Sequence, residues 1–213
     1  MKKLLGITAL VLSLALLVAS PAWAVIRQAG YTKYSGTVTS NAARITVPTI
    51  TCNTGDSGKT VAAWVGIDDF SFLSQTGFSA FCSGTTESYS LWYEVYPRPA
   101  RSTGIAVSPG DRVNFTINVR ANDVEFIINN LTDGTGNRLF YEAEPGAHAG
   151  IRNYLAEDGI GGQVAPKFTE IVFRRNSGFV SGMTKVQDQP PFNVGAINSC
   201  GGTCQTFWVR DSR

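Results

Sequence analysis

Three neighbouring stretches decide the fold: Ala62-Ala63-Trp64-Val65-Gly66-Ile67-Asp68, Gln75-Thr76-Gly77 and Leu91-Trp92-Tyr93-Glu94-Val95-Tyr96-Pro97. The first and third are rich in aromatic and β-branched residues, which are typical of strands. The second reads as a turn region between them, which would place Gln75 beside two strands. A glutamine cannot act as an acid or a base, but its amide can donate hydrogen bonds to a developing oxyanion.

Outward from these stretches, apolar and polar residues alternate with a period of two, and turn residues separate the runs. The segments 112–120 and 124–129 form the clearest predicted hairpin, and the stretch 176–200, rich in Gly, Pro, Gln and Asn, is expected to be a long surface loop. Frequent short strands without helical periodicity predict an all-β chain, folded as a single antiparallel β-sandwich or barrel. The strands are expected at 44–47, 61–67, 89–96, 112–120, 124–129, 138–144, 168–174 and 205–209.

The first 24 residues have the pattern of a secretory signal peptide. Lys2 and Lys3 precede the apolar run 4–19, and Pro21-Ala22-Trp23-Ala24 ends it with small residues at the cleavage positions. A retained anchor helix is the alternative, but the apolar run is short for a full membrane span. We therefore expect cleavage after Ala24, a mature domain over 25–213, and secretion to an extracellular or periplasmic location.

Charge argues against several classes of partner. The chain has 18 Lys+Arg and 16 Asp+Glu, and removal of Lys2 and Lys3 leaves 16 of each sign. A nucleic-acid partner would require a basic stripe, so none is expected. No second apolar segment is long enough to span a bilayer, and we expect no membrane association after signal removal.

The cysteine count indicates disulfides. An even number of cysteines in an exported chain is typical of disulfide bonding. A metal site would need more ligands than the chain offers, because His148 is the only histidine. The same scarcity argues against a Ser-His-Asp triad. We predict no metal or cofactor, and two disulfides, Cys52–Cys82 and Cys200–Cys204.

Together these stretches resemble the glutamic peptidases, or eqolisins. The resemblance rests on the order and spacing of Trp64-Val65-Gly66-Ile67-Asp68, Gln75-Thr76-Gly77, Trp92-Tyr93-Glu94-Val95-Tyr96-Pro97 and Ser108-Pro109-Gly110-Asp111, and covers roughly residues 31–175. It implies a concanavalin A-like sandwich of two large antiparallel sheets. In that family a glutamate takes a proton from water, the water attacks the scissile carbonyl, and a glutamine amide stabilises the oxyanion.

By this resemblance Gln75 is the catalytic glutamine, but the glutamate is harder to place. The family's strand motif, Ala-Glu-Trp-Ile-x-Glu, is best matched by residues 152–157, which puts Asn153 at the catalytic position. Losing a general base lowers the rate by about 10²–10⁴. Glu157 comes four residues later, on the same face of a strand but roughly 13 Å further along. A shifted alignment or a β-bulge would bring Glu157 to the site, so it remains the catalytic candidate.

Other positions also depart from the family pattern. Two supporting aspartates are replaced, one by Ser79 or Ala80 and the other by Ser90. Glu142 and Glu144 share one face of a predicted strand and are weaker candidates for the base. Paired with Glu94, they would instead suit a glycoside hydrolase, although a solvated acidic face is the simpler interpretation. The residues expected to line a substrate groove are Trp64, Asp68, Glu94, Tyr96 and Asn153, although Trp and Tyr at sheet positions often belong to the core.

We therefore expect a secreted acid endopeptidase of glutamic-peptidase type, acting on polypeptides as a monomer and without a cofactor. The replacement at Asn153 leaves its activity uncertain. The alternative is a catalytically inactive sandwich that binds peptide or carbohydrate on its concave face. The two hypotheses differ in one observable, namely whether a carboxylate shares a water molecule with the amide of Gln75.

Overall fold

The computed structural model describes residues 27–33, 38–68, 73–142, 155–162, 165–177, 179, 182–187 and 191–213. All regular structure in these ranges is β, and the strands pair antiparallel in two large sheets. The predicted β-sandwich is therefore confirmed. The described part of the chain contains no helix with the length and apolar character needed to cross a bilayer. Residues 1–24, the predicted signal peptide, lie outside the described residues.

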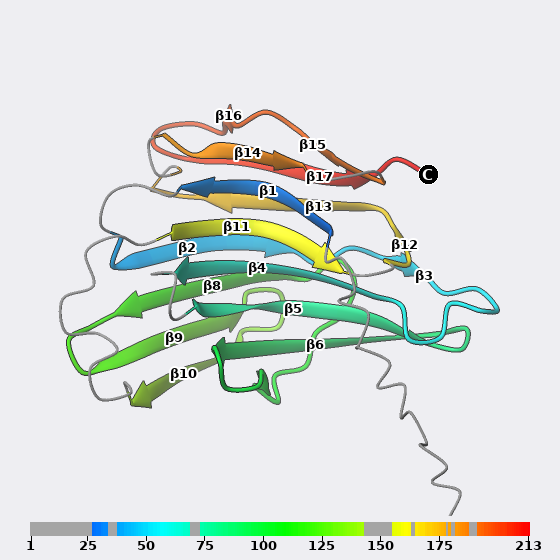
Figure 1. The fold of residues 1–213 in the computed structure, drawn as a ribbon, viewed down its shortest axis with the longest axis horizontal. Coiled ribbons are helices and arrows are strands. Elements are labelled where there is room, and N and C mark those ends of the chain that lie inside the picture. The colour runs from blue at the N-terminus through cyan, green and yellow to red at the C-terminus, as the bar shows by residue number, and fades with distance from the viewer. Residues whose placement is uncertain are drawn as a thin grey trace, which may run out of the picture.

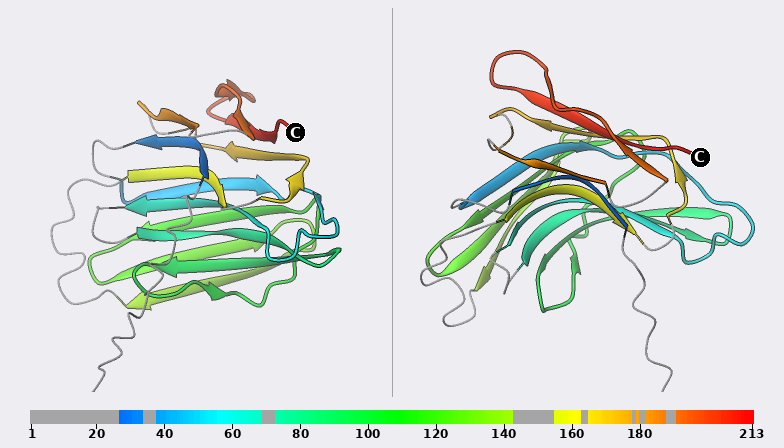
Figure 2. Two further views of the ribbon diagram at one scale, coloured as in Figure 1. Left: turned by 45° about the vertical axis from the view of Figure 1, so that its right-hand side comes forward. Right: turned by 45° about the horizontal axis from the view of Figure 1, so that its top comes forward.

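The two sheets form two stacked layers (Figure 1), and strands such as β11, β4 and β5 are bent along their length (Figure 2). The seven-stranded sheet has the order β14 (Thr184–Gln187), β1 (Arg27–Lys33), β11 (Leu155–Gly162), β4 (Thr60–Asp68), β5 (Leu73–Ser83), β6 (Thr86–Val95) and β7 (Arg101–Ser102). The eight-stranded sheet has the order β10 (Thr135–Glu142), β9 (Asp123–Asn130), β8 (Arg112–Val119), β2 (Ser40–Thr46), β13 (Glu170–Arg175), β17 (Gln205–Asp211) and β15 (Phe192–Val194), with β16 (Asn198–Ser199) also paired to β17. A small third sheet joins β3 (Ile50–Thr51) to β12 (Lys167–Phe168).

The core lies between the two layers and follows from the alternation within each strand. On β8, for example, Val113, Phe115 and Ile117 are fully buried, and the residues between them are more exposed. Burying a Phe or Ile side chain stabilises a fold by about 1.5–3 kcal/mol. The largest side chains in this layer are Phe78, Phe115, Phe126, Phe173, Phe192, Phe207, Ile45, Ile67, Leu91, Ile117 and Ile128.

The prediction of a turn region around Gln75 was wrong, because residues 73–83 form the long central strand β5. Thr76 and Phe78 are completely buried, as is every second residue around them, whereas Gln75 lies on the opposite face. The interspersed Gly77 and the polar residues concealed this alternation. The first strand, Arg27–Lys33, was not predicted.

The stretch 176–200 is only partly a surface loop. It contains the short strands β14, β15 and β16, and Phe192 and Val194 pack into the core. The turn residues of the segment obscured these strands because each strand is very short. The predicted hairpin corresponds to β8 and β9, which pair along their whole length.

Both predicted disulfides are confirmed, Cys52–Cys82 and Cys200–Cys204, and the chain has no free cysteine. The first joins Cys52, directly after β3, to Cys82 near the end of β5, and so links the small third sheet to the seven-stranded sheet. The second closes the turn that leads into β17.

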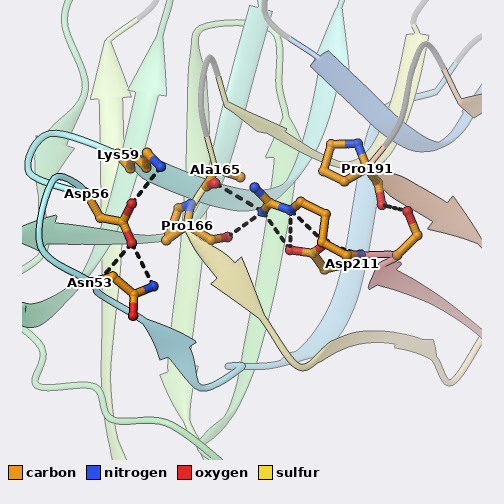
Figure 3. A network of polar contacts seen from close by, with 9 residues as sticks. Asn53, Asp56, Lys59, Ala165, Pro166, Pro191 and Asp211 are labelled. Carbon is orange, nitrogen blue, oxygen red and sulfur yellow. Dashed lines mark hydrogen bonds and ion pairs between the residues drawn. The ribbon is translucent and has the colours of Figure 1, made fainter.

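Two polar clusters fix the loops near the ends of these strands (Figure 3). Asp56 accepts a hydrogen bond from the backbone N–H of Asn53 at 2.8 Å and pairs with Lys59 at 2.6 Å. At the C-terminus, Arg213 pairs with Asp211 at 2.6 Å and donates to the backbone carbonyls of residues 165 and 166. The last residues of the chain are therefore attached to the segment before β12.

Candidate active site

One row of residues crosses the middle of the seven-stranded sheet. Gln75 on β5 pairs with Gly66 on β4 and, on its other side, with Glu94 on β6. Beyond β4, the strand β11 pairs Glu157 with the same Gly66, and β1 pairs Thr32 with Glu157. Residues directly opposite one another in an antiparallel sheet lie on the same face. These five positions therefore share the face of the sheet that points away from the core.

Gln75 is held from one side by a carboxylate. Its Nε2 donates a short hydrogen bond to Oε2 of Glu94, and both side chains are half-buried. This hydrogen bond restrains the rotation of the Gln75 amide. A primary amide carries two hydrogens on its nitrogen, and the second has no partner among the residues that the structure describes.

Gly66 is the one residue of the row that lies between Gln75 and residue 157. The two backbone positions are separated by two strand spacings, or about 10 Å between Cα atoms. Because glycine has no side chain, β4 itself contributes no side chain between them. Gly66 is buried.

Two tryptophans form the adjacent row on the same face. Gly77 of β5 lies between Trp64 on β4 and Trp92 on β6. Trp64 is only 7% exposed, and among the described residues neither indole Nε1 has a hydrogen-bond partner. A buried indole N–H usually has an acceptor, so these two donors are suited to the carbonyl oxygens of a bound ligand.

A cavity of about 380 Å³ adjoins the row beside β6. Its lining is mainly small and polar, and it shares Trp92 and Glu94 with the site. Arg101 lines it too, and its guanidinium lies 5.5 Å from the ring centre of Tyr141. The complete lining is Ser79, Ser90, Trp92, Glu94, Ala100, Arg101 and Ser102.

Of the remaining predicted site residues, Asp68 and Tyr96 lie at the ends of the strands that carry the row. Asp68 ends β4 opposite Leu73 and is half-buried. Tyr96 directly follows β6 and is 55% exposed. Asn153 lies outside the described residues, as do Glu144 and His148. Glu142 is on β10, the edge strand of the other sheet, and so is not in the sheet that holds Gln75.

The backbone register places position 157 in the same row as Gln75. The sequence motif alone had not aligned these two positions. It also adds Thr32, which no sequence pattern indicated. Thr32 is 4% exposed, and its Oγ1 has no hydrogen-bond partner within the described ranges. Among those same residues, no cluster of three or more His, Cys, Asp or Glu side chains is placed to hold a metal ion.

Several solved structures share this fold. Scytalido-glutamic peptidase, solved with a peptide-based transition-state analogue, superposes with a TM-score of 0.65 at 20% identity, covering 87% of this chain and 98% of that one. SCP-B, a member of the eqolisin family solved with the tripeptide Ala-Ile-His, gives 0.63 at 20% identity over the same shares. Aspergilloglutamic peptidase from Aspergillus niger gives 0.51 at 22% identity, covering 70% of this chain and 98% of that one.

The structural similarities, at such low identity, show the fold alone. The family assignment comes from sequence comparison. No curated relative matches the chain in sequence. The family model described as the peptidase A4 family matches residues 27–189, which include every strand of the row described above. The chain therefore belongs to the peptidase A4 family, the glutamic peptidases.

Proposed function

We propose that the protein is an exported acid endopeptidase in which Gln75 and Glu157 act on either side of one water molecule. The observation that carries this proposal is the shared pairing of both residues with Gly66. Membership of a peptidase family supports a polypeptide substrate. The two disulfides support export, because such bonds persist in oxidising compartments.

In the proposed mechanism, the ionised carboxylate of Glu157 takes a proton from water as the water oxygen attacks the scissile carbonyl. The carbonyl oxygen gains negative charge, and the free N–H of the Gln75 amide stabilises it. The protonated carboxyl then gives its proton to the leaving amine as the C–N bond breaks. Glu94 keeps the Gln75 amide oriented throughout. The base must begin ionised, so protonation of Glu157 before the water attacks would stop this step.

The test uses the purified mature chain with denatured casein across about pH 2–7. Loss of an oxyanion donor in Gln75→Ala should lower kcat by about 10²–10³, and loss of the base in Glu157→Gln should lower it by about 10²–10⁴. Glu170→Gln and Gln205→Ala are matched controls on the other sheet and should keep wild-type rates. Casein cleavage that survives either substitution in the row would refute the dyad. Peptide binding without cleavage by the wild type would favour the inactive, ligand-binding alternative.

A further inference from the structure

A buried polar relay, formed by Asn41 and Arg175, lies behind the catalytic row in the mainly apolar layer between the sheets. Asn41 on β2 of the eight-stranded sheet is completely buried, and its Nδ2 donates to the carbonyl oxygen of Gly66 at 2.8 Å. The contact crosses from one sheet to the other. It ends on the residue that separates Gln75 from residue 157.

The other end of the same amide is also occupied. Nη1 of Arg175, the last residue of β13, donates a short hydrogen bond to Oδ1 of Asn41. Arg175 is 5% exposed, and its guanidinium lies 5.4 Å from the ring centre of Phe179. An arginine donates and never accepts, so Arg175 holds the Asn41 oxygen toward itself and the Asn41 nitrogen toward Gly66.

Stability alone does not account for this choice of residues. Removing a charge from water is unfavourable, and well-packed apolar residues in place of a buried polar pair are often neutral or stabilising. The relay instead restrains Gly66, which has no side chain that could pack against its neighbours. Glycine is the least conformationally restricted residue, and residues 75 and 157 are both aligned on its backbone.

We propose that Asn41 and Arg175 are positioning residues that fix the Gly66 backbone and, through it, the spacing of the catalytic pair. This inference rests on the proposed function, since it assigns the relay to that same row. A displacement of about 1 Å in a catalytic group can lower a rate by about 10². Loss of the relay should therefore lower kcat and leave substrate binding largely intact.

Two substitutions remove the donor to Gly66 in different ways. Asn41→Ser shortens the side chain out of reach, whereas Asn41→Asp keeps an acceptor for Arg175 and turns an oxygen toward the Gly66 carbonyl. Both should lower kcat about 10- to 100-fold with KM within about twofold of wild type. Arg175→Lys keeps the charge with a different donor geometry and should retain more activity than either.

Asn130 provides a matched control. It is 1% exposed and its Nδ2 also donates to a backbone carbonyl, that of Ala106, but on β9 and away from the row. Asn130→Ser should lower the melting temperature and leave kcat unchanged. If the Asn41 variants lose stability to the same extent while keeping wild-type kcat, the relay is merely structural and the inference is overturned.

A readout independent of activity separates this inference from the proposed function. The side-chain amide signals of Gln75 in a ¹H–¹⁵N NMR spectrum can be assigned by their loss in Gln75→Ala. They should shift in Asn41→Ser, or in Arg175→Lys if the first variant does not fold, and stay fixed in Asn130→Ser. Unmoved signals would overturn the inference. A wild-type chain that fails to cleave casein would refute the proposed function, and the NMR shift alone would then decide whether the relay positions the row.

Discussion

At the scale of single residues, the carboxylate of Asp56 makes a contribution to stability that depends on pH. Its hydrogen bond with Lys59, followed by the backbone N–H of Asn53, lowers its pKa to about 2 from an ordinary value of 3.8. A group whose pKa is lower in the folded state contributes stability above its unfolded pKa and loses it as pH falls through the folded value. The contribution of Asp56 is therefore complete above about pH 4 and disappears toward pH 2.

Replacing Lys59 with Met tests this account. The variant should melt below the wild type near neutral pH, and the difference should shrink as pH falls from about 4 to about 2. The measurement is the thermal midpoint by circular dichroism across that range. Lys167→Met changes an exposed lysine on β12 and should give a pH-independent difference. A Lys59→Met difference that stays constant down to pH 2 would contradict the assignment.

At the level of the element, Gly77 allows β5 to lie close against β4. A Cβ atom at this position would lie 2.8 Å from Cα of Trp64 and nearer still to the carbonyl oxygen of Ala63. Both neighbours are backbone atoms in a paired strand, so neither can rotate away. Gly77, which led to the prediction of a turn at this position, is therefore required for β5 to pair with β4.

Gly77→Ala should consequently destabilise the fold by about 3 kcal/mol, the upper end of the usual effect of overpacking. Ser79→Ala, on the same strand and face, should change stability by no more than about 0.5 kcal/mol. Denaturant unfolding of both variants measures the difference. Equal midpoints for Gly77→Ala and the wild type would show that the two strands can separate at no cost.

The strands that could be predicted are those with a clear local signal. Residues 112–119 alternate Val113, Phe115 and Ile117 with polar neighbours, and a Pro-Gly turn precedes them. By contrast, β1 and β5 each contain a glycine, which is depleted in strands and weakens the local signal. Their position in the sheet could not be inferred from local pattern alone.

At the scale of the whole molecule, the two disulfides should contribute unequally. Cys52–Cys82 spans 30 residues and Cys200–Cys204 spans 4. A cross-link that closes a longer loop removes more entropy from the unfolded chain, which predicts about 3–4 kcal/mol for the first and about 2 kcal/mol for the second. Denaturant unfolding of the two double Cys→Ala variants tests this order, and a larger loss from the short loop would contradict it.

Only part of the candidate site could be predicted from the sequence, because the rest depends on how distant strands pair in the whole molecule. Gln75 and Glu94 lie in motifs that match the family, and their pairing follows from adjacent strands. The alignment of residue 157 depends on β11 pairing with β4, a strand formed from a distant part of the chain. Motif matching gave precedence to Asn153, because no local pattern encodes the register between strands so far apart.

The place of β11 in the sheet has a consequence for biosynthesis. This strand lies between β1 and β4, both of which leave the ribosome long before it. Until residues 155–162 insert between those two strands, Glu157 is not in the same row as Gln75 in the nascent polypeptide. If that acid is the base, a chain that stalls before residue 162 of the 213 cannot digest the proteins around it, and hydrolytic activity begins only after β11 has been made.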